Sequence, residues 1–96
     1  DVVDQVNTHL IIQTENLIEK GVNRSQIAVD PGLGFGKKME DSKELFFNLH
    51  NLINTYPIVV GYSRKKFTDQ LNMTNNEMID HCLDSGVDLL RLHLDN

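Results

Sequence analysis

Ionisable side chains stand at the ends of three short apolar runs in this sequence. Asp30 follows the first run, residues 27–29, and Arg64 and Lys65 follow the second, residues 58–60. Arg91 and His93 close the third. If the runs are parallel strands, their ends meet at the edge where α/β proteins gather ligands. The sequence therefore predicts a site that combines a carboxylate with cations.

The loop after the first run is rich in glycine and reads DPGLGFGK at residues 30–37. It is not a Walker loop, because Pro31 replaces the first glycine and Lys38 replaces the Ser or Thr. It is not the dinucleotide pattern G-x-G-x-x-G, because Lys37 occupies the place of the last glycine. What remains is a carboxylate beside a loop that can approach a flat ligand closely. Asp30 could accept two hydrogen bonds from an amidine-like edge such as a 2-aminopyrimidinone, or it could cap its own turn.

The second segment reads GYSRKKF at residues 61–67 and the third reads RLH at residues 91–93. Cations at a strand end that opens a helix can neutralise a substrate oxyanion together with free backbone N–H groups. A solvated basic turn is the alternative for this second segment. Arg91 and His93 share one face of a strand because side chains alternate. The pair suits a diphosphate, which Arg can bind with two parallel hydrogen bonds.

Composition limits the function classes. The 96 residues are 40% hydrophobic and 24% charged, which is typical of one small globular domain. The net charge of −5 argues against a general binder of nucleic acid or of anionic membranes. Six of the nine Lys and Arg residues nevertheless lie at or just after the predicted strands, and this favours an anionic ligand.

Cysteine and histidine usage predicts no metal site. Cys82 is the one cysteine and lies in an apolar helical pattern, so we interpret it as a core residue. His9, His50 and His81 fall in helical stretches, and no spacing among His, Cys and carboxylates fits zinc. No apolar run approaches the roughly 20 residues of a membrane span, and a cytoplasmic location is expected.

The elements that must position these groups alternate between helix and strand. The apolar periodicity predicts helices at about residues 2–20, 41–53 and 76–84, with a short helix around Phe67 and Leu71. Asp41 and Glu44 are interpreted as a capping box that opens the second helix. Gly21 and Gly86 provide helix stops.

Apolar runs without alternation, separated by amphipathic helices, indicate parallel strands covered by helices, so the fold class is α/β. Three strands do not close a barrel, and parallel sheets need cover on both faces. We therefore expect residues 1–96 to form a single partial domain of something larger.

The three segments together resemble dihydropteroate synthase, a pterin-binding barrel family, in content, order and approximate spacing. The likeness covers essentially the whole chain. It implies the C-terminal part of a TIM-type (βα)₈ barrel, from the helix after strand five to strand eight. The implied reaction joins 6-hydroxymethyl-7,8-dihydropterin diphosphate to p-aminobenzoate.

The resemblance also implies roles for individual residues. Asp30 would bind the pterin ring, and Lys65 would contact the carbonyl and N5 side of that ring. Arg91 and His93 would bind the diphosphate. The catalytic residues would be Lys65, Arg91 and His93. Phe35 would lie near the p-aminobenzoate ring. The remaining substrate-binding residues would be Gly34, Ser63, Arg64 and Lys66. Mg²⁺ would assist the leaving diphosphate, and its protein ligand belongs to the first five strands, which this chain lacks.

The sequence departs from the family at two positions and leaves alternatives open. Lys66 stands where serine is common, and the ending is His-Leu-Asp rather than His-Asp-Val. One alternative is a pterin-binding methyltransferase of the same barrel type, although the cations of the second segment favour a diphosphate. Another is a non-catalytic α/β fragment that binds a partner chain. The expected partners are the two small molecules and either a second copy or the missing half of the barrel.

Overall fold

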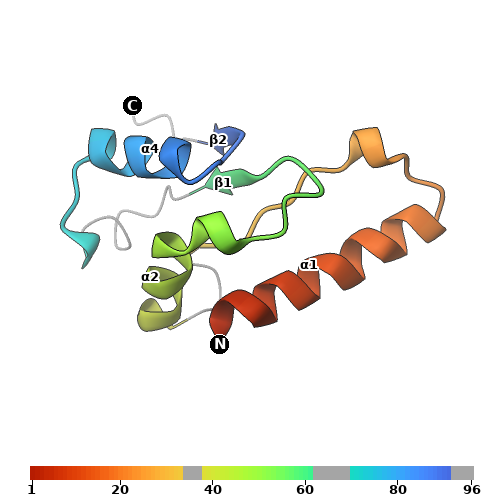
Figure 1. Ribbon diagram of the computed structural model, residues 1–96, viewed down its shortest axis with the longest axis horizontal. Coiled ribbons are helices and arrows are strands. Elements are labelled where there is room, and N and C mark those ends of the chain that lie inside the picture. The colour runs from red at the N-terminus through yellow and green to blue at the C-terminus, as the bar shows by residue number, and fades with distance from the viewer. Residues whose placement is uncertain (34–37, 62–69, 92–96) are drawn as a thin grey trace, which may run out of the picture.

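A computed structural model describes residues 1–33, 38–61 and 70–91 (Figure 1). In chain order its elements are α1 (Val2–Glu19), η1 (Arg24–Gln26), α2 (Met39–Phe47), η2 (Leu49–Asn51), β1 (Val59–Gly61), α4 (Asn75–Asp84) and β2 (Leu89–Arg91). The predicted alternation of helices and strands is confirmed from α2 to β2, whereas the first predicted strand is only an isolated bridge. The short helix expected around Phe67 and Leu71 falls largely on residues outside those described.

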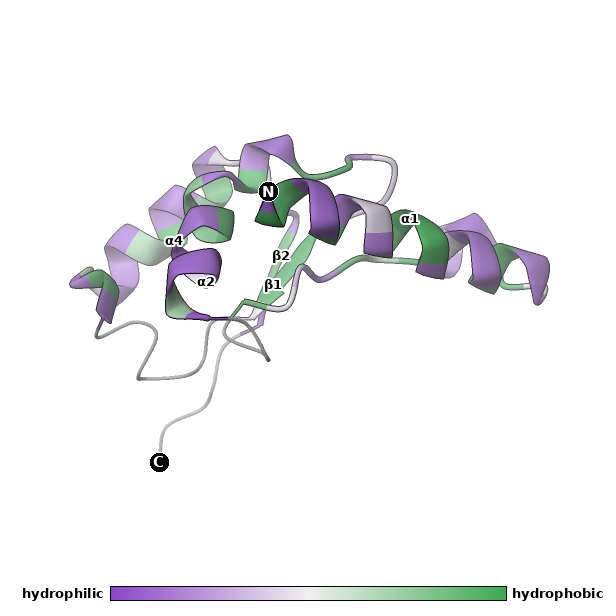
Figure 2. Ribbon diagram, turned by 90° about the horizontal axis from the view of Figure 1, so that it is seen from below, coloured by the Kyte–Doolittle hydropathy of each residue, from purple (hydrophilic) through white to green (hydrophobic). Residues whose placement is uncertain are grey.

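Helix α1 follows its apolar periodicity closely. Asp1 caps its N-terminus by accepting a hydrogen bond of 2.9 Å from the backbone N–H of Asp4. The face that carries Val2, Val3, Val6 and Leu10 is buried, and Figure 2 shows apolar and polar segments alternating along the helix. The helix ends before Gly21, whose φ of +95° suits glycine.

The side chain of Asn7 ties α1 to the segment after η2. Its amide donates to the carbonyl of Asn51 at 3.0 Å, and its carbonyl accepts from the N–H of Ile53 at 2.9 Å. Together with the contact between α1 and α2, this fixes the first half of α1 against the rest of the chain (Figure 1).

Helix α2 begins earlier than predicted. Its N-cap is Lys38 and no side chain caps it, so the capping box proposed for Asp41 and Glu44 is wrong. Asp41 instead lies in the first helical turn, where its charge is favourable near the positive end of the helix dipole. A capping box does occur at α4, where Thr74 and Glu77 bond reciprocally and hold the pKa of the Glu77 carboxyl below its usual value.

The strands are parallel, and β1 lies one residue later than the apolar run at residues 58–60. In the register of β1 with β2, Val59 pairs with Leu89 and Gly61 with Arg91. The first predicted strand, residues 27–29, is reduced to a single bridge between Val29 and Ile58. Strand β1 therefore lies in the middle, with the Val29 segment on one side and β2 on the other.

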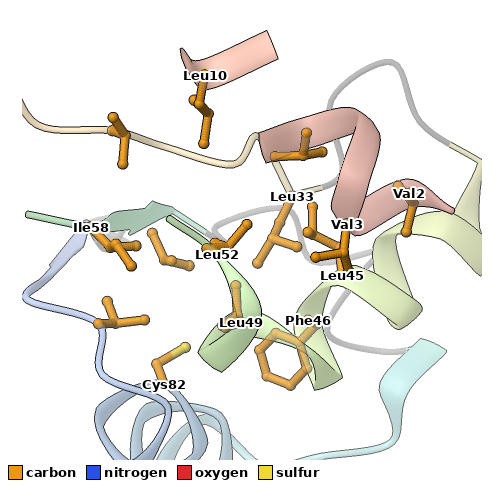
Figure 3. Close-up of a cluster of buried hydrophobic side chains, with 14 of the residues drawn as sticks. Val2, Val3, Leu10, Leu33, Leu45, Phe46, Leu49, Leu52, Ile58 and Cys82 are labelled. Atoms are coloured by element: carbon orange, nitrogen blue, oxygen red, sulfur yellow. The ribbon is translucent and has the colours of Figure 1, made fainter. Parts of the chain in front are cut away.

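The helices cover one face of these strands. Val29, Ile58 and Val60 point into that face and are buried. Figure 3 shows the core that they join, in which side chains from α1, α2, η2 and α4 converge. Its fully buried side chains include Leu45, Phe46, Leu49, Val60, Met78 and Cys82. The opposite face is open, and Leu89 on it is 62% exposed.

Cys82 is a core residue, as predicted. Its side chain is fully buried, and burial raises the pKa of its thiol to about 11. The thiol is therefore protonated at neutral pH and a poor nucleophile. None of the described helices is long and apolar enough to span a membrane.

Phe46 and its neighbour Phe47 provide a matched test of the core. Phe46 is fully buried whereas Phe47 is 48% exposed. We expect Phe46→Ala to lower the free energy of unfolding by about 3–5 kcal/mol, because it removes packed apolar surface and leaves a cavity. Phe47→Ala should cost about 1 kcal/mol or less. Urea unfolding followed by circular dichroism measures both, and equal losses would contradict this core.

Candidate functional site

Asp30 and Arg91, which are 61 positions apart in the sequence, meet at the ends of the strands. Nη2 of Arg91 lies 3.8 Å from Oδ2 of Asp30. The Arg91 side chain is 63% exposed and that of Asp30 is 36% exposed. The predicted convergence of a carboxylate and a cation at this edge is confirmed for this pair.

Asp30 also caps its own turn, which was the alternative interpretation of this residue. Its Oδ1 accepts a hydrogen bond of 2.8 Å from the N–H of Gly32, whose φ is +76°. The turn uses one carboxylate oxygen and leaves the other facing Arg91. The turn cap is therefore confirmed, the binding of an amidine-like ligand edge stays a prediction, and the turn orients the carboxylate that Arg91 meets.

The side chain of Arg91 lies across Gly61, its partner in the strand register. Gly61 is on the middle strand, so the guanidinium passes over β1 to reach Asp30 on the far side. The face that carries this arrangement is the open one, and a ligand can reach it directly.

A hollow of about 590 Å³ lies between α1 and the segments that carry Asp30 and Lys38. Its polar lining includes Gln5, His9, Gln13, Asp30 and Lys38. His9 has no signal for this position in the sequence, because helical periodicity does not show which helix face lies beside a distant loop. Among the described residues, no three His, Cys, Asp or Glu side chains gather closely enough to hold a metal ion.

His81 packs against Phe46 and bonds to its backbone. Its Nε2 lies 2.7 Å from the carbonyl oxygen of Phe46, and its ring stacks on the Phe46 ring with centroids 4.4 Å apart. These contacts join α4 to the end of α2.

All of the other predicted site residues lie outside the described ranges. They are Gly34, Phe35, Ser63, Arg64, Lys65, Lys66 and His93. Their roles stay predictions. The described part of the site consists of Asp30, Gly61 and Arg91.

The family of this chain follows from its similarity to known proteins. The family model described as "Pterin binding enzyme" matches residues 1–93. This chain belongs to the pterin-binding enzyme family. The resemblance to dihydropteroate synthase is thereby confirmed, since the relatives of this chain carry that name.

Two curated relatives show the extent of the likeness. The dihydropteroate synthase of Streptococcus pyogenes is 30% identical over 104 aligned positions, which cover 97% of this chain and 39% of that protein. The dihydropteroate synthase of Staphylococcus haemolyticus is 32% identical over 71 residues, which cover 73% of this chain and 27% of that protein. This chain thus spans well under half the length of these relatives.

A solved structure gives the same result for the fold. Dihydropteroate synthase of Xanthomonas albilineans, in complex with 7,8-dihydropteroate, matches 97% of this chain and 39% of its own with a TM-score of 0.77 and 27% identity. The same enzyme has been solved with 4-aminobenzoic acid. The predicted fold class is confirmed, because this chain folds as a fragment of an α/β barrel.

Substitution of Asp30 separates its two interactions. Asp30→Asn keeps an oxygen for the N–H of Gly32 but removes the charge facing Arg91. We expect it to change the free energy of unfolding by about 1 kcal/mol or less, since an exposed ion pair contributes little. Asp30→Ala also removes the turn hydrogen bond and should cost about 0.5–1.5 kcal/mol more.

Urea unfolding at low and high salt measures both variants. A large, salt-independent loss in Asp30→Asn would show that the carboxylate stabilises the fold rather than the site.

Proposed function

We propose that this chain supplies the pterin- and diphosphate-binding part of a dihydropteroate synthase. The reaction is the condensation of 6-hydroxymethyl-7,8-dihydropterin diphosphate with p-aminobenzoate. The observation that supports this function best is the meeting of Asp30 and Arg91 on an open sheet face at the strand ends, in a chain of the pterin-binding family.

Asp30 and Arg91 have complementary roles in this proposal. The pterin ring carries a 2-amino group beside a ring N–H, and a carboxylate can accept from both. The diphosphate carries the charge that leaves when the aniline nitrogen attacks the pterin methylene, and a guanidinium can bind two of its oxygens. The chain thus contributes orientation of the ring and stabilisation of the departing charge.

Residues outside the described ranges complete the proposed site. Lys65 would contact the carbonyl and N5 side of the pterin, and His93 would assist Arg91 at the diphosphate. Phe35 and Lys66 would lie on the side of the p-aminobenzoate, with Gly34, Ser63 and Arg64 as further contacts.

The resemblance implies that Mg²⁺ assists the departing diphosphate. Mg²⁺ is commonly held by one or two carboxylates together with substrate phosphates, and among the described residues no three His, Cys, Asp or Glu side chains gather closely enough to hold a metal ion by themselves. No step of the proposal depends on the ion.

The open sheet face favours one alternative, a non-catalytic fragment that binds a partner supplying further strands. Leu89 is an apolar side chain on that face and is 62% exposed. A pterin-binding methyltransferase is favoured less, because the guanidinium at the strand ends suits a diphosphate better than a methyl group.

Calorimetric titration tests the binding half of the proposal. We expect the chain to bind the pterin diphosphate in the presence of Mg²⁺, and Arg91→Ala or Lys65→Ala to weaken binding about tenfold or more, because each removes a charge-assisted hydrogen bond. Arg24→Ala is the matched control, since Arg24 is an exposed cation in η1, which precedes the Val29 segment rather than following a strand. Equal losses in all three variants would indicate charge attraction without a site.

Turnover tests the requirement for the rest of the barrel. We expect no dihydropteroate from this chain alone, because it covers 27% and 39% of the length of its two curated relatives. Product formation is followed by chromatography of the pterin reaction mixture. Turnover that disappears in Lys65→Ala would overturn this expectation.

A further inference from the structure

Gly61 occupies the one place over which Arg91 must pass to reach Asp30. Strand β1 lies between the Val29 segment and β2, and Gly61 is the register partner of Arg91. The Arg91 side chain starts on β2 and ends 3.8 Å from Asp30 on the opposite side of β1. The path of the guanidinium therefore crosses the middle strand at Gly61.

Backbone conformation does not explain the glycine at this position. The described glycines with positive φ are Gly21, Gly32 and Gly86, and Gly61 is not among them. Gly61 lies in a strand, where a residue with a side chain is ordinarily favoured over glycine. Its presence must have another cause.

The space above Gly61 is filled by the guanidinium of Arg91. A Cβ atom at Gly61 would lie 2.5 Å from Nη2, 2.7 Å from Nε and 3.0 Å from Cζ of Arg91. These three atoms are the nearest to that Cβ position, and all belong to the end of one flexible side chain. A methyl group here would displace the guanidinium and leave the backbone in place.

We propose that Gly61 is a positioning residue. Because it has no side chain, it leaves a space on β1, here called the seat, in which the guanidinium of Arg91 lies as it crosses toward Asp30. The seat holds the cation on the open face where the diphosphate binds, so this inference rests on the proposed function. A seat of this kind acts through Arg91 and makes no contact with the reacting atoms.

A purely structural glycine would behave differently on substitution. If Gly61 served the fold, Gly61→Ala would destabilise the chain. If it serves Arg91, Gly61→Ala should leave the urea midpoint unchanged or raise it, because alanine restricts the unfolded chain and suits an ordinary strand conformation. The altered property should be the environment of the Arg91 guanidinium.

Nuclear magnetic resonance of the Arg91 Nε–Hε group tests the seat without any ligand. The resonance is assigned by its loss in Arg91→Lys. We expect a nuclear Overhauser contact between this group and the Hα protons of Gly61 in the wild type, and a shifted resonance in Gly61→Ala. An absent contact, an unchanged resonance or an unfolded Gly61→Ala chain would each overturn the proposal.

Calorimetry with inorganic pyrophosphate tests the consequence for binding. We expect Gly61→Ala to weaken binding about as much as Arg91→Ala, roughly tenfold, and to add nothing in the Arg91→Ala background. Full affinity in Gly61→Ala, or an additive loss in the double variant, would overturn the role of the seat. If the wild type binds no pyrophosphate, the proposed function fails for this chain, and the resonance measurement alone decides the role of Gly61.

Discussion

The alternation of side chains across the parallel strands is the constraint on which the rest of this structure depends. Val29, Ile58 and Val60 point into the helix-covered face and join the core. The pleat therefore sends Asp30 and Arg91 to the other face. A shift of one residue in register would exchange the two faces, so the packing that stabilises the fold also specifies the site.

Stability and proposed chemistry are consequently carried by different residues. The core depends on fully buried side chains such as Phe46 and Met78, whereas the pair formed by Asp30 and Arg91 is exposed and contributes little. An exposed pair can exchange its partner for a charged ligand at small cost. Gly61 connects the core with the proposed site. Strand β1 buries Val60 in the core on one face, and Gly61 leaves room on the other face for the guanidinium of Arg91.

The open face also relates this fragment to the complete barrels of its family. In a closed barrel, residues that alternate with the helix-facing ones line the interior. Leu89 occupies such a position, and its 62% exposure is what an interior residue shows when only part of the barrel surrounds it. The charged groups at the strand ends lie on the same face, at the rim where barrel enzymes place their sites.

Local chemistry in the sequence determined the type and order of the elements, the α/β class, the burial of Cys82 and the strand ends at which Asp30 and Arg91 stand. These follow from periodicity and from turn residues, which act over a few positions. The tertiary structure decided the rest. It moved the start of α2 to Met39, reduced the first strand to a bridge at Val29, and brought Arg91 over Gly61. Those outcomes depend on strand register and on contacts between distant segments, and neither has a signature in the spacing of residues along the chain.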